Sequence, residues 1–202
     1  MLDKYNINAT TLRILALYRS DYSVGLHLRA IAKAIKIDVK AVQIHLKKLE
    51  ALNVLSSAQK GRNREYRLNL NNSSILLYLA LAELFATLEF MSIKNNFVIK
   101  RFMESVYDND GIVLLFGSFA RGNATKRSDI DLYIITKKPA KRAISQMPDL
   151  SNKINIQYAT EESFRRGMAE KDPLVMEVVS NHVALIGAEQ LCKILREYYA
   201  RY

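Results

Sequence analysis

Two aspartates and a Gly-Ser pair are the residues of this chain whose types and spacing could support chemistry. Gly117 and Ser118 are followed by ten residues and then by Asp129 and Asp131. Because side chains alternate along a β-strand, two aspartates two positions apart point to one face. Carboxylates and triphosphate oxygens together make an all-oxygen site that suits Mg²⁺, or Mn²⁺ in its place. Two such ions can stabilise both the attacking and the leaving oxygen of a phosphoryl-type transfer.

Two apolar runs must position these residues. Residues 112–116 (Ile-Val-Leu-Leu-Phe) lie directly before Gly117, and residues 132–135 (Leu-Tyr-Ile-Ile) directly follow Asp131. Short apolar runs of this kind, bounded by glycine or polar residues, predict buried strands. Gly117 allows a sharp turn and a close approach of the backbone to a ligand. Ser118 then begins a short helical turn, whose free backbone N–H groups favour an anion.

The Gly-Ser pair, the ten-residue gap and the Asp-x-Asp pair, with a strand on either side, resemble the motif of the polymerase-beta-like nucleotidyltransferases. The likeness is to their small prokaryotic "minimal" members and covers about residues 95–190. It implies a mixed sheet with helices, metal ions and an NTP. The resemblance assigns metal binding and catalysis to Asp129 and Asp131, and nucleotide binding to Gly117, Ser118 and Arg121. A solvated helix face explains Arg121 equally well.

One position departs from the pattern of that family. Active members carry a third carboxylate on a neighbouring strand, whereas the matching strand here, residues 154–158, has Asn155. An amide oxygen can still be a metal ligand, but an amide carries no charge and cannot act as a general base. Glu161 and Glu162 are close in sequence, although after Thr160 they fit the first turn of a helix better. The sequence therefore predicts nucleotide and metal binding and leaves efficient catalysis open.

The positive charge of the chain is concentrated near its beginning. The formal net charge is +10, and residues 1–70 contain 13 Lys/Arg against 5 Asp/Glu. Residues 71–202 contain 17 Lys/Arg against 15 Asp/Glu, so they are nearly neutral. This asymmetry indicates a nucleic-acid-binding module joined to a second module of another kind.

The first seventy residues have the pattern of three helices followed by a basic hairpin. The predicted helices cover residues 10–19, 26–35 and 39–52, and the predicted strands 54–57 and 65–68 flank a basic loop at 59–64. Asp38 is a good N-cap for the third helix, which we expect to bury Val39, Val42, Leu46 and Leu49. Asn53 suits the left-handed residue that ends it. Over residues 8–70 the pattern resembles a winged helix-turn-helix of the bacterial and archaeal regulator type.

In a winged helix-turn-helix the third helix enters the major groove of DNA. We expect the base edges to be met by Lys40, Gln43, Ile44 and Lys47, and phosphates by Lys47, Lys48, Arg62 and Arg64. Among these, Gln43 has the amide needed to bind adenine bidentately.

A helix of unusual composition is predicted between the two modules. Residues 75–91 are apolar almost all the way round and contain neither Gly nor Pro. Glu83 and Glu89 argue against a lipid environment. Packing between the modules and pairing with a second copy both remain, and we favour the homodimer. The expected domains are a winged helix-turn-helix at 1–70, a connector at 71–93 and a nucleotidyltransferase-like domain at 94–202.

These features together predict a two-domain α+β protein. Cys192 is the single cysteine, which excludes a disulfide framework within the chain, and the first residues lack the apolar stretch of a signal peptide, so we expect a cytoplasmic protein. Our interpretation is a regulator that binds double-stranded DNA and carries a domain for NTP and Mg²⁺. The alternatives are an active enzyme that moves NMP from NTP to an unknown acceptor, and an interaction partner of a toxin-type helical protein.

Overall fold

The computed structural model describes residues 7–93, 99, 111–125, 128–137 and 154–201. The chain divides into two compact units, one made of residues 1–85 with 192–202 and the other of residues 86–191. We call them the first and the second unit. The sequence had suggested boundaries near 70 and 93 and one domain running to the C-terminus.

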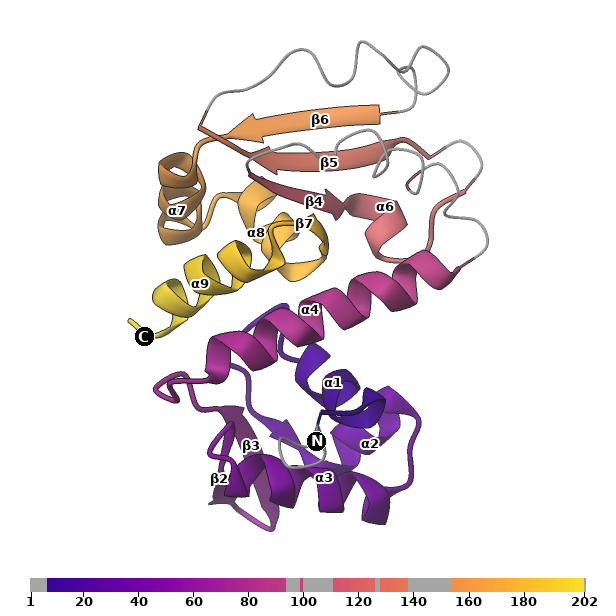
Figure 1. Cartoon of the computed structure of the whole chain (residues 1–202), viewed down its shortest axis with the longest axis vertical. Helices are drawn as coiled ribbons and strands as arrows, with labels where there is room; N and C mark the ends of the chain where they lie inside the picture. Colours follow the sequence, from indigo (N-terminus) through magenta and orange to yellow (C-terminus); the bar gives the residue numbers. More distant parts are fainter. Residues whose placement is uncertain (1–6, 94–98, 100–110, 126–127, 138–153, 202) are drawn as a thin grey trace. The chain divides into compact units, whose positions relative to one another are not determined.

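The first unit contains the predicted three helices and hairpin (Figure 1). In chain order its elements are α1 (Ala9–Ala16), β1 (Leu26–His27), α2 (Leu28–Ile35), α3 (Val39–Ala51), β2 (Leu55–Lys60) and β3 (Asn63–Leu68). The strands form an antiparallel sheet in the order β1-β3-β2. β2 and β3 extend into the predicted loop and leave a tight turn at Gly61, whose φ of 61° is left-handed.

Local capping sets the ends of these helices. The Asp38 side chain accepts hydrogen bonds from the backbone of Lys40 and Ala41, and Asn53 has a φ of 57°, so both predictions at α3 are confirmed. α1 begins earlier than predicted, because Asn8 caps it by accepting from the Thr11 N–H. The prediction of a helix from residue 26 is wrong at its start. Leu26 and His27 are extended and pair with β3.

Apolar side chains of all three helices form the core of the first unit. Its fully buried members include Ile14, Leu15, Ile31, Val42, Leu46 and Leu49. The Tyr18 hydroxyl donates to the backbone oxygen of Tyr66 at 3.0 Å and links the residues after α1 to the hairpin. Val39 was expected in this core but is 38% exposed, because it is the first residue of α3 and precedes the buried stripe.

Parts of two further helices, up to residue 85 in one and from residue 192 in the other, complete the first unit. α4 (Ile75–Ser92) is the predicted connector helix, and the Glu83 carboxylate on it accepts from Arg19 at 2.7 Å while its own side chain is 1% exposed. α9 (Ala188–Tyr199) ends the described chain, and its Tyr199 ring lies 5.6 Å from that of Tyr22. Arg196 donates to the backbone oxygen of Leu70. These contacts explain why residues 192–202 belong to the first unit.

The second unit is built on a four-stranded mixed sheet. Its elements are β4 (Ile112–Phe116), α6 (Gly117–Ala120), β5 (Ile130–Ile135), β6 (Ile154–Ala159), α7 (Glu161–Glu170), α8 (Pro173–Ser180) and β7 (Val183–Ile186). The strand order is β6-β5-β4-β7, with β5 and β6 parallel and the other pairs antiparallel. The predicted α+β class is therefore confirmed. From the sequence we also expect a helix from residue 95 to about 107 and a helix or a loop from Pro139 to about 147, and both lie outside the described residues, apart from residue 99.

Buried side chains fix the register of this sheet. All five residues of β4 are buried, as expected of a central strand. One face of the sheet forms a core of aliphatic residues that includes Val113, Leu115, Leu132 and Leu185. On the other face, the Tyr133 ring lies 5.7 Å from that of Phe164 on α7. This packing holds the end of β4 and the start of β5 in place, where Gly117 and Asp131 lie.

Candidate functional sites

Gly117 and Asp131 are in direct contact at one end of the sheet. β4 and β5 are antiparallel and pair Phe116 with Asp131, so the residue that ends β4 faces the start of β5. Gly117 has a left-handed φ of 70°, and a Cβ placed on it would lie 2.5 Å from Asp131 Oδ2. Position 117 therefore requires glycine for two reasons, its backbone conformation and the carboxylate against it.

The turn after Gly117 brings the chain back to the aspartates. Ser118 and the rest of α6 form one helical turn, closed by the Arg121 N–H donating to the Gly117 oxygen at 3.1 Å. Asp129 is exposed and immediately precedes β5, whereas Asp131 is half-buried on it. The Gly-Ser turn therefore lies at the end of the sheet where β5 begins, near the two aspartates.

Asn155 occupies the place beside Asp131 on the neighbouring strand. The two residues are register partners across the parallel β5–β6 pair. The Asn155 amide nitrogen donates to Asp131 Oδ1 at 3.2 Å. The sequence therefore located the neighbouring strand correctly, and an uncharged donor stands where a third carboxylate was expected.

Glu161 and Glu162 do not replace that carboxylate. Asn155 is near the start of β6 and α7 follows the end of that strand. At the usual rise of a strand, roughly 15–20 Å separate Asn155 from the two glutamates. Thr160 caps α7, and both glutamates lie in its first turn, as the capping interpretation predicted. Glu161 accepts from Arg165 at 2.8 Å and from Gln190 at 3.2 Å. Within the described residues, His, Cys, Asp and Glu side chains form no group of three suited to a metal ion.

We call Asp129, Asp131 and Asn155, beside the Gly117–Ser118 turn, the carboxylate site. Its donors are oxygens of two carboxylates and one amide, which fit a hard cation such as Mg²⁺ or Mn²⁺. Arg121, the further predicted phosphate contact, pairs with Glu177 of α8 at 2.6 Å. Both side chains are about 40% exposed, so this pair is weak, and an anion can compete for the guanidinium.

The outer side of α3 has the exposure that the sequence predicts. Val42, Leu46 and Leu49 are fully buried. Five other residues of the helix are exposed, one before this buried set and four within it: Lys40, Gln43, Ile44, Lys47 and Lys48. Ile44 is 56% exposed and is the apolar residue in this polar group. Together with Arg62 and Arg64, both exposed at the hairpin turn, we call these residues the basic face.

An open cleft of about 690 Å³ lies between the hairpin and the start of α2 and α3. Its lining residues are His27, Leu28, Arg29, Gln43, Arg62, Asn63, Arg64 and Tyr66. None is acidic, and three are arginines. Sequence reasoning missed His27, Arg29 and Asn63, because their place in the cleft depends on β1, which pairs with the hairpin across almost forty residues.

The acid of the hairpin is turned away from solvent and neutralised. Glu65 is 8% exposed and pairs with Arg67 at 2.7 Å and with Lys60 at 3.2 Å. The hydrogen bond from Arg67 lowers the pKa of the Glu65 carboxyl below its ordinary value of 4.5, against the opposing effect of burial. Gly25 leaves room for this carboxylate, since a Cβ there would lie 2.2 Å from it. The basic face therefore keeps its positive charge.

Comparison with known families agrees with the geometry of the second unit. A family model described as "Nucleotidyltransferase domain" matches residues 98–184, a stretch that contains the whole carboxylate site. No curated protein and no solved structure gives a significant match to the chain. The C-terminal part of this chain therefore carries a nucleotidyltransferase-like domain.

Proposed function

We propose that this chain is a cytoplasmic DNA-binding protein, a transcriptional regulator, whose nucleotidyltransferase-like domain binds NTP with Mg²⁺ or Mn²⁺. The observation that carries the first part is the basic face. Exposed cations on α3 and at the hairpin turn flank a cleft without acidic lining. Clustered cations of this kind neutralise phosphates and supply most of the affinity for a nucleic acid.

The order of elements supports a winged helix-turn-helix. Three helices, a short strand and a hairpin follow one another, and the outer side of α3 is polar and exposed. In that docking geometry Gln43 and Ile44 reach base edges from the major groove. Lys47, Lys48 and the arginines of the hairpin bind phosphates, and Arg29 joins them from the other wall of the cleft.

Fluorescence anisotropy with a labelled random 30-base-pair duplex tests DNA binding. The test variant replaces Lys40, Lys47, Arg62 and Arg64 by alanine. A matched variant removes the same charge from four exposed cations elsewhere, Lys137, Arg166, Lys193 and Arg201. We expect the first variant to lose most of its affinity and the second to lose little. Equal affinity of both variants and the wild type would contradict the proposal.

The carboxylate site supports nucleotide binding in the second unit. Asp129, Asp131 and the Asn155 oxygen would hold a Mg²⁺ or Mn²⁺ ion, and Ser118 would contact the phosphates. Such an ion, when bound, polarises the phosphoryl group and neutralises the charge that develops on it. Isothermal titration with ATP, GTP, CTP and UTP in the presence of Mg²⁺ tests this binding. We expect heat with the wild type and none with Asp129→Ala/Asp131→Ala.

Active nucleotidyl transfer is the second candidate function. The family match and the close contact of Gly117 with Asp131 favour it. Transfer requires a group that accepts the proton of the acceptor hydroxyl, and Asn155 cannot do so. A carboxylate of Asp129 or Asp131 would have to serve, which predicts a slow reaction. Incubation with labelled NTPs and candidate protein or small-molecule acceptors measures it, and no transfer to any acceptor would contradict this candidate.

A further inference from the structure

Four leucines, three of them exposed and one half-buried, form a narrow stripe along α4. Leu77, Leu84 and Leu88 are 63%, 50% and 69% exposed, and Leu81 between them is half-buried. They follow one another at spacings of four, three and four residues. This alternation is the a/d spacing of a coiled coil, in which the stripe faces a partner helix. We call Leu77, Leu81, Leu84 and Leu88 the leucine seam.

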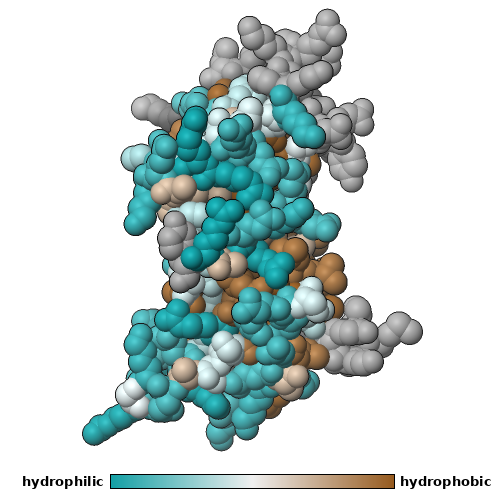
Figure 2. Space-filling view, turned by 90° about the vertical axis from the view of Figure 1, so that its left-hand side faces the viewer, coloured by the Kyte–Doolittle hydropathy of each residue, from teal (hydrophilic) through white to brown (hydrophobic). Residues whose placement is uncertain are grey.

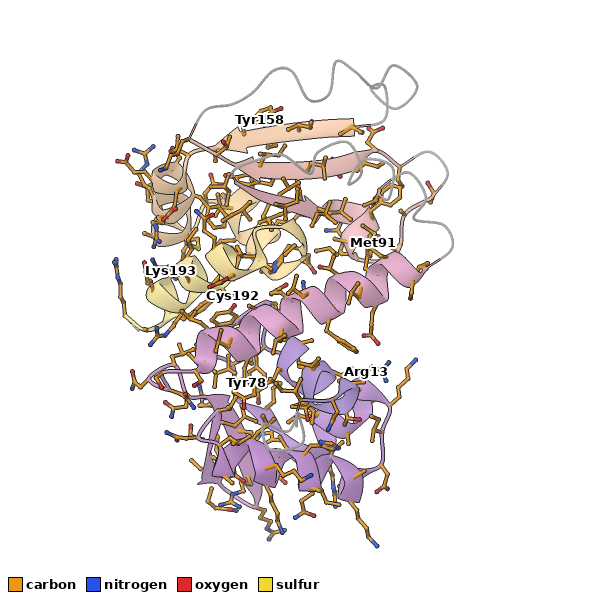
Figure 3. The ribbon with its side chains drawn as sticks, in the orientation of Figure 1. Arg13, Tyr78, Met91, Tyr158, Cys192 and Lys193 are labelled. Atoms are coloured by element: carbon orange, nitrogen blue, oxygen red, sulfur yellow. The ribbon has the colours of Figure 1, made fainter. Side chains whose placement is uncertain are left out.

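The seam belongs to a helix that is otherwise firmly held. Ile75 and Ala82 are fully buried, and Glu83 is tied to Arg19 at 2.7 Å. Near the other end of the helix the buried Thr87 hydroxyl donates to the backbone oxygen of Ala184 at 3.0 Å. Figure 3 labels Tyr78 and Met91 toward the two ends of α4. The exposure of the leucines is therefore not the result of a loosely packed helix.

A lipid bilayer fits this surface poorly. α4 is long and apolar enough to cross a membrane by length and composition, with a mean hydropathy of 1.7. A spanning helix, however, needs apolar surface around its circumference, whereas the buried Glu83 pair commits another side of α4 to Arg19. Figure 2 shows that apolar surface (brown) is confined to part of a mostly hydrophilic surface. A stripe of this width fits one helix.

We propose that the leucine seam pairs with the same seam of a second copy of this chain. The spacing is self-complementary, because residues of one type repeat at both a and d positions. Leu84 is near the middle of the seam, so a two-fold axis places it against its equivalent if the two helices run parallel, and within about one helical turn of it if they run antiparallel. The inference does not depend on DNA binding.

The size of the seam sets the expected strength of this dimer. Twelve residues of helix, from Leu77 to Leu88, extend over roughly 17 Å, and a helix is about 10 Å wide. Such a contact buries less than the roughly 800 Å² per partner of a standard stable interface. The dimer is therefore reversible, with a Kd on the order of micromolar.

Sedimentation equilibrium of the full chain between 1 and about 300 µM tests the dimer, a range that brackets the expected Kd. We expect a monomer–dimer equilibrium in the wild type. Leu84→Glu should weaken it on the order of a hundredfold, because two like charges meet at the centre of the seam. Leu174→Glu, at a 37% exposed leucine of α8, is the matched control and should leave it unchanged. Circular dichroism verifies that both variants fold.

Cross-linking provides a second readout that does not require a destabilising charge. Cys192, the native cysteine, is fully buried on α9 (Figure 3). Under mild oxidation, Leu84→Cys should form an interchain disulfide and Leu174→Cys should not. A wild type that stays monomeric throughout the range, or a dimer unaffected by Leu84→Glu, would overturn the proposal. Monomers that float with phosphatidylcholine vesicles would identify lipid as the occupant instead and would also overturn it.

Discussion

Asp131 contacts Gly117 on one side and Asn155 on the other, whereas the cations of the basic face are spread over α3 and the hairpin. In the carboxylate site a few oxygen atoms must lie close enough to bind one metal ion. A change in one side chain can therefore abolish metal and nucleotide binding. On the basic face each cation adds its own contribution to a common field, so changes act gradually. The comparison predicts all-or-none effects in the second unit and graded effects in the first.

The largest effect is expected at the carboxylate site, where substitutions of two glycines can be compared. Gly117→Ala puts a methyl group 2.5 Å from Asp131 Oδ2, whereas Gly122→Ala has the same left-handed φ but no atom within 4 Å. Both variants pay about 1–2 kcal/mol of backbone strain. Only Gly117→Ala should lower the affinity for Mg–NTP, by about 10- to 100-fold, because it displaces a ligand carboxylate. Calorimetry measures both, and equal losses would mean that the contact with Asp131 is unimportant.

Asn155→Asp tests whether the missing charge limits the carboxylate site. The variant exchanges a hydrogen bond to Asp131 for a repelling carboxylate, so the metal-free protein should unfold at a lower temperature than the wild type. Mg²⁺ should bind about tenfold more tightly, because a third negative ligand faces it. Thermal unfolding across a Mg²⁺ titration measures both effects. If Mg²⁺ stabilises the variant no more than Asn155→Ala, charge at this position does not matter.

Ile44 provides a test of the basic face, where the expected change in DNA affinity comes from one methyl group. An exposed isoleucine on a helix in the major groove is suited to the 5-methyl group of thymine. The wild type should bind poly(dA-dT) about fourfold more tightly than poly(dA-dU), which lacks that methyl group. Ile44→Ala should bind the two polymers equally, while Gln43→Ala keeps the preference. A wild type without preference excludes this contact yet leaves DNA binding by the cations untouched.

The smallest expected effect concerns His45, at the inner edge of the basic face. Its Nδ1 lies 3.1 Å from the Thr11 hydroxyl, and burial, with Lys48 nearby, lowers its pKa below the ordinary 6.5. The folded state therefore favours the neutral imidazole, which stabilises it above pH 6.5 and is lost as the pH falls below that value. The melting temperature should fall between pH 7 and pH 5, and less so in His45→Gln. Parallel curves would exclude His45 as a cause.

Features with a local cause could be predicted from the sequence. Asp38 and Thr160 cap the helices that follow them, because a side-chain oxygen needs only the N–H groups of the next turn. The place of Asn155 beside Asp131 was implied by the resemblance to the nucleotidyltransferase motif, and the apolar alternation of residues 154–158 marked the strand that carries it. The strand pattern placed Asp129 and Asp131 at the start of a strand, and the family resemblance added Asn155 to them.

Features that depend on distant partners could not be predicted. β1 forms because Leu26 and His27 meet the hairpin, and no signal in residues 26–35 distinguishes it from a first turn of α2. For that reason Arg29 was not recognised as part of the basic cleft. Arg121 was placed near phosphates without Glu177, which lies fifty-six residues further on. In each case the contact joins elements that are far apart in the chain, and their relative position cannot be predicted from local sequence patterns.

The salt dependence of DNA affinity tests the central claim most directly. The logarithm of the binding constant falls linearly with the logarithm of the salt concentration, by about 0.9 for each phosphate neutralised. Removing Lys40, Lys47, Arg62 and Arg64 should therefore reduce the slope by between about three and four units. Removing Lys137, Arg166, Lys193 and Arg201 should leave it near the wild-type value. Equal slopes in both variants would show that the basic face does not hold DNA.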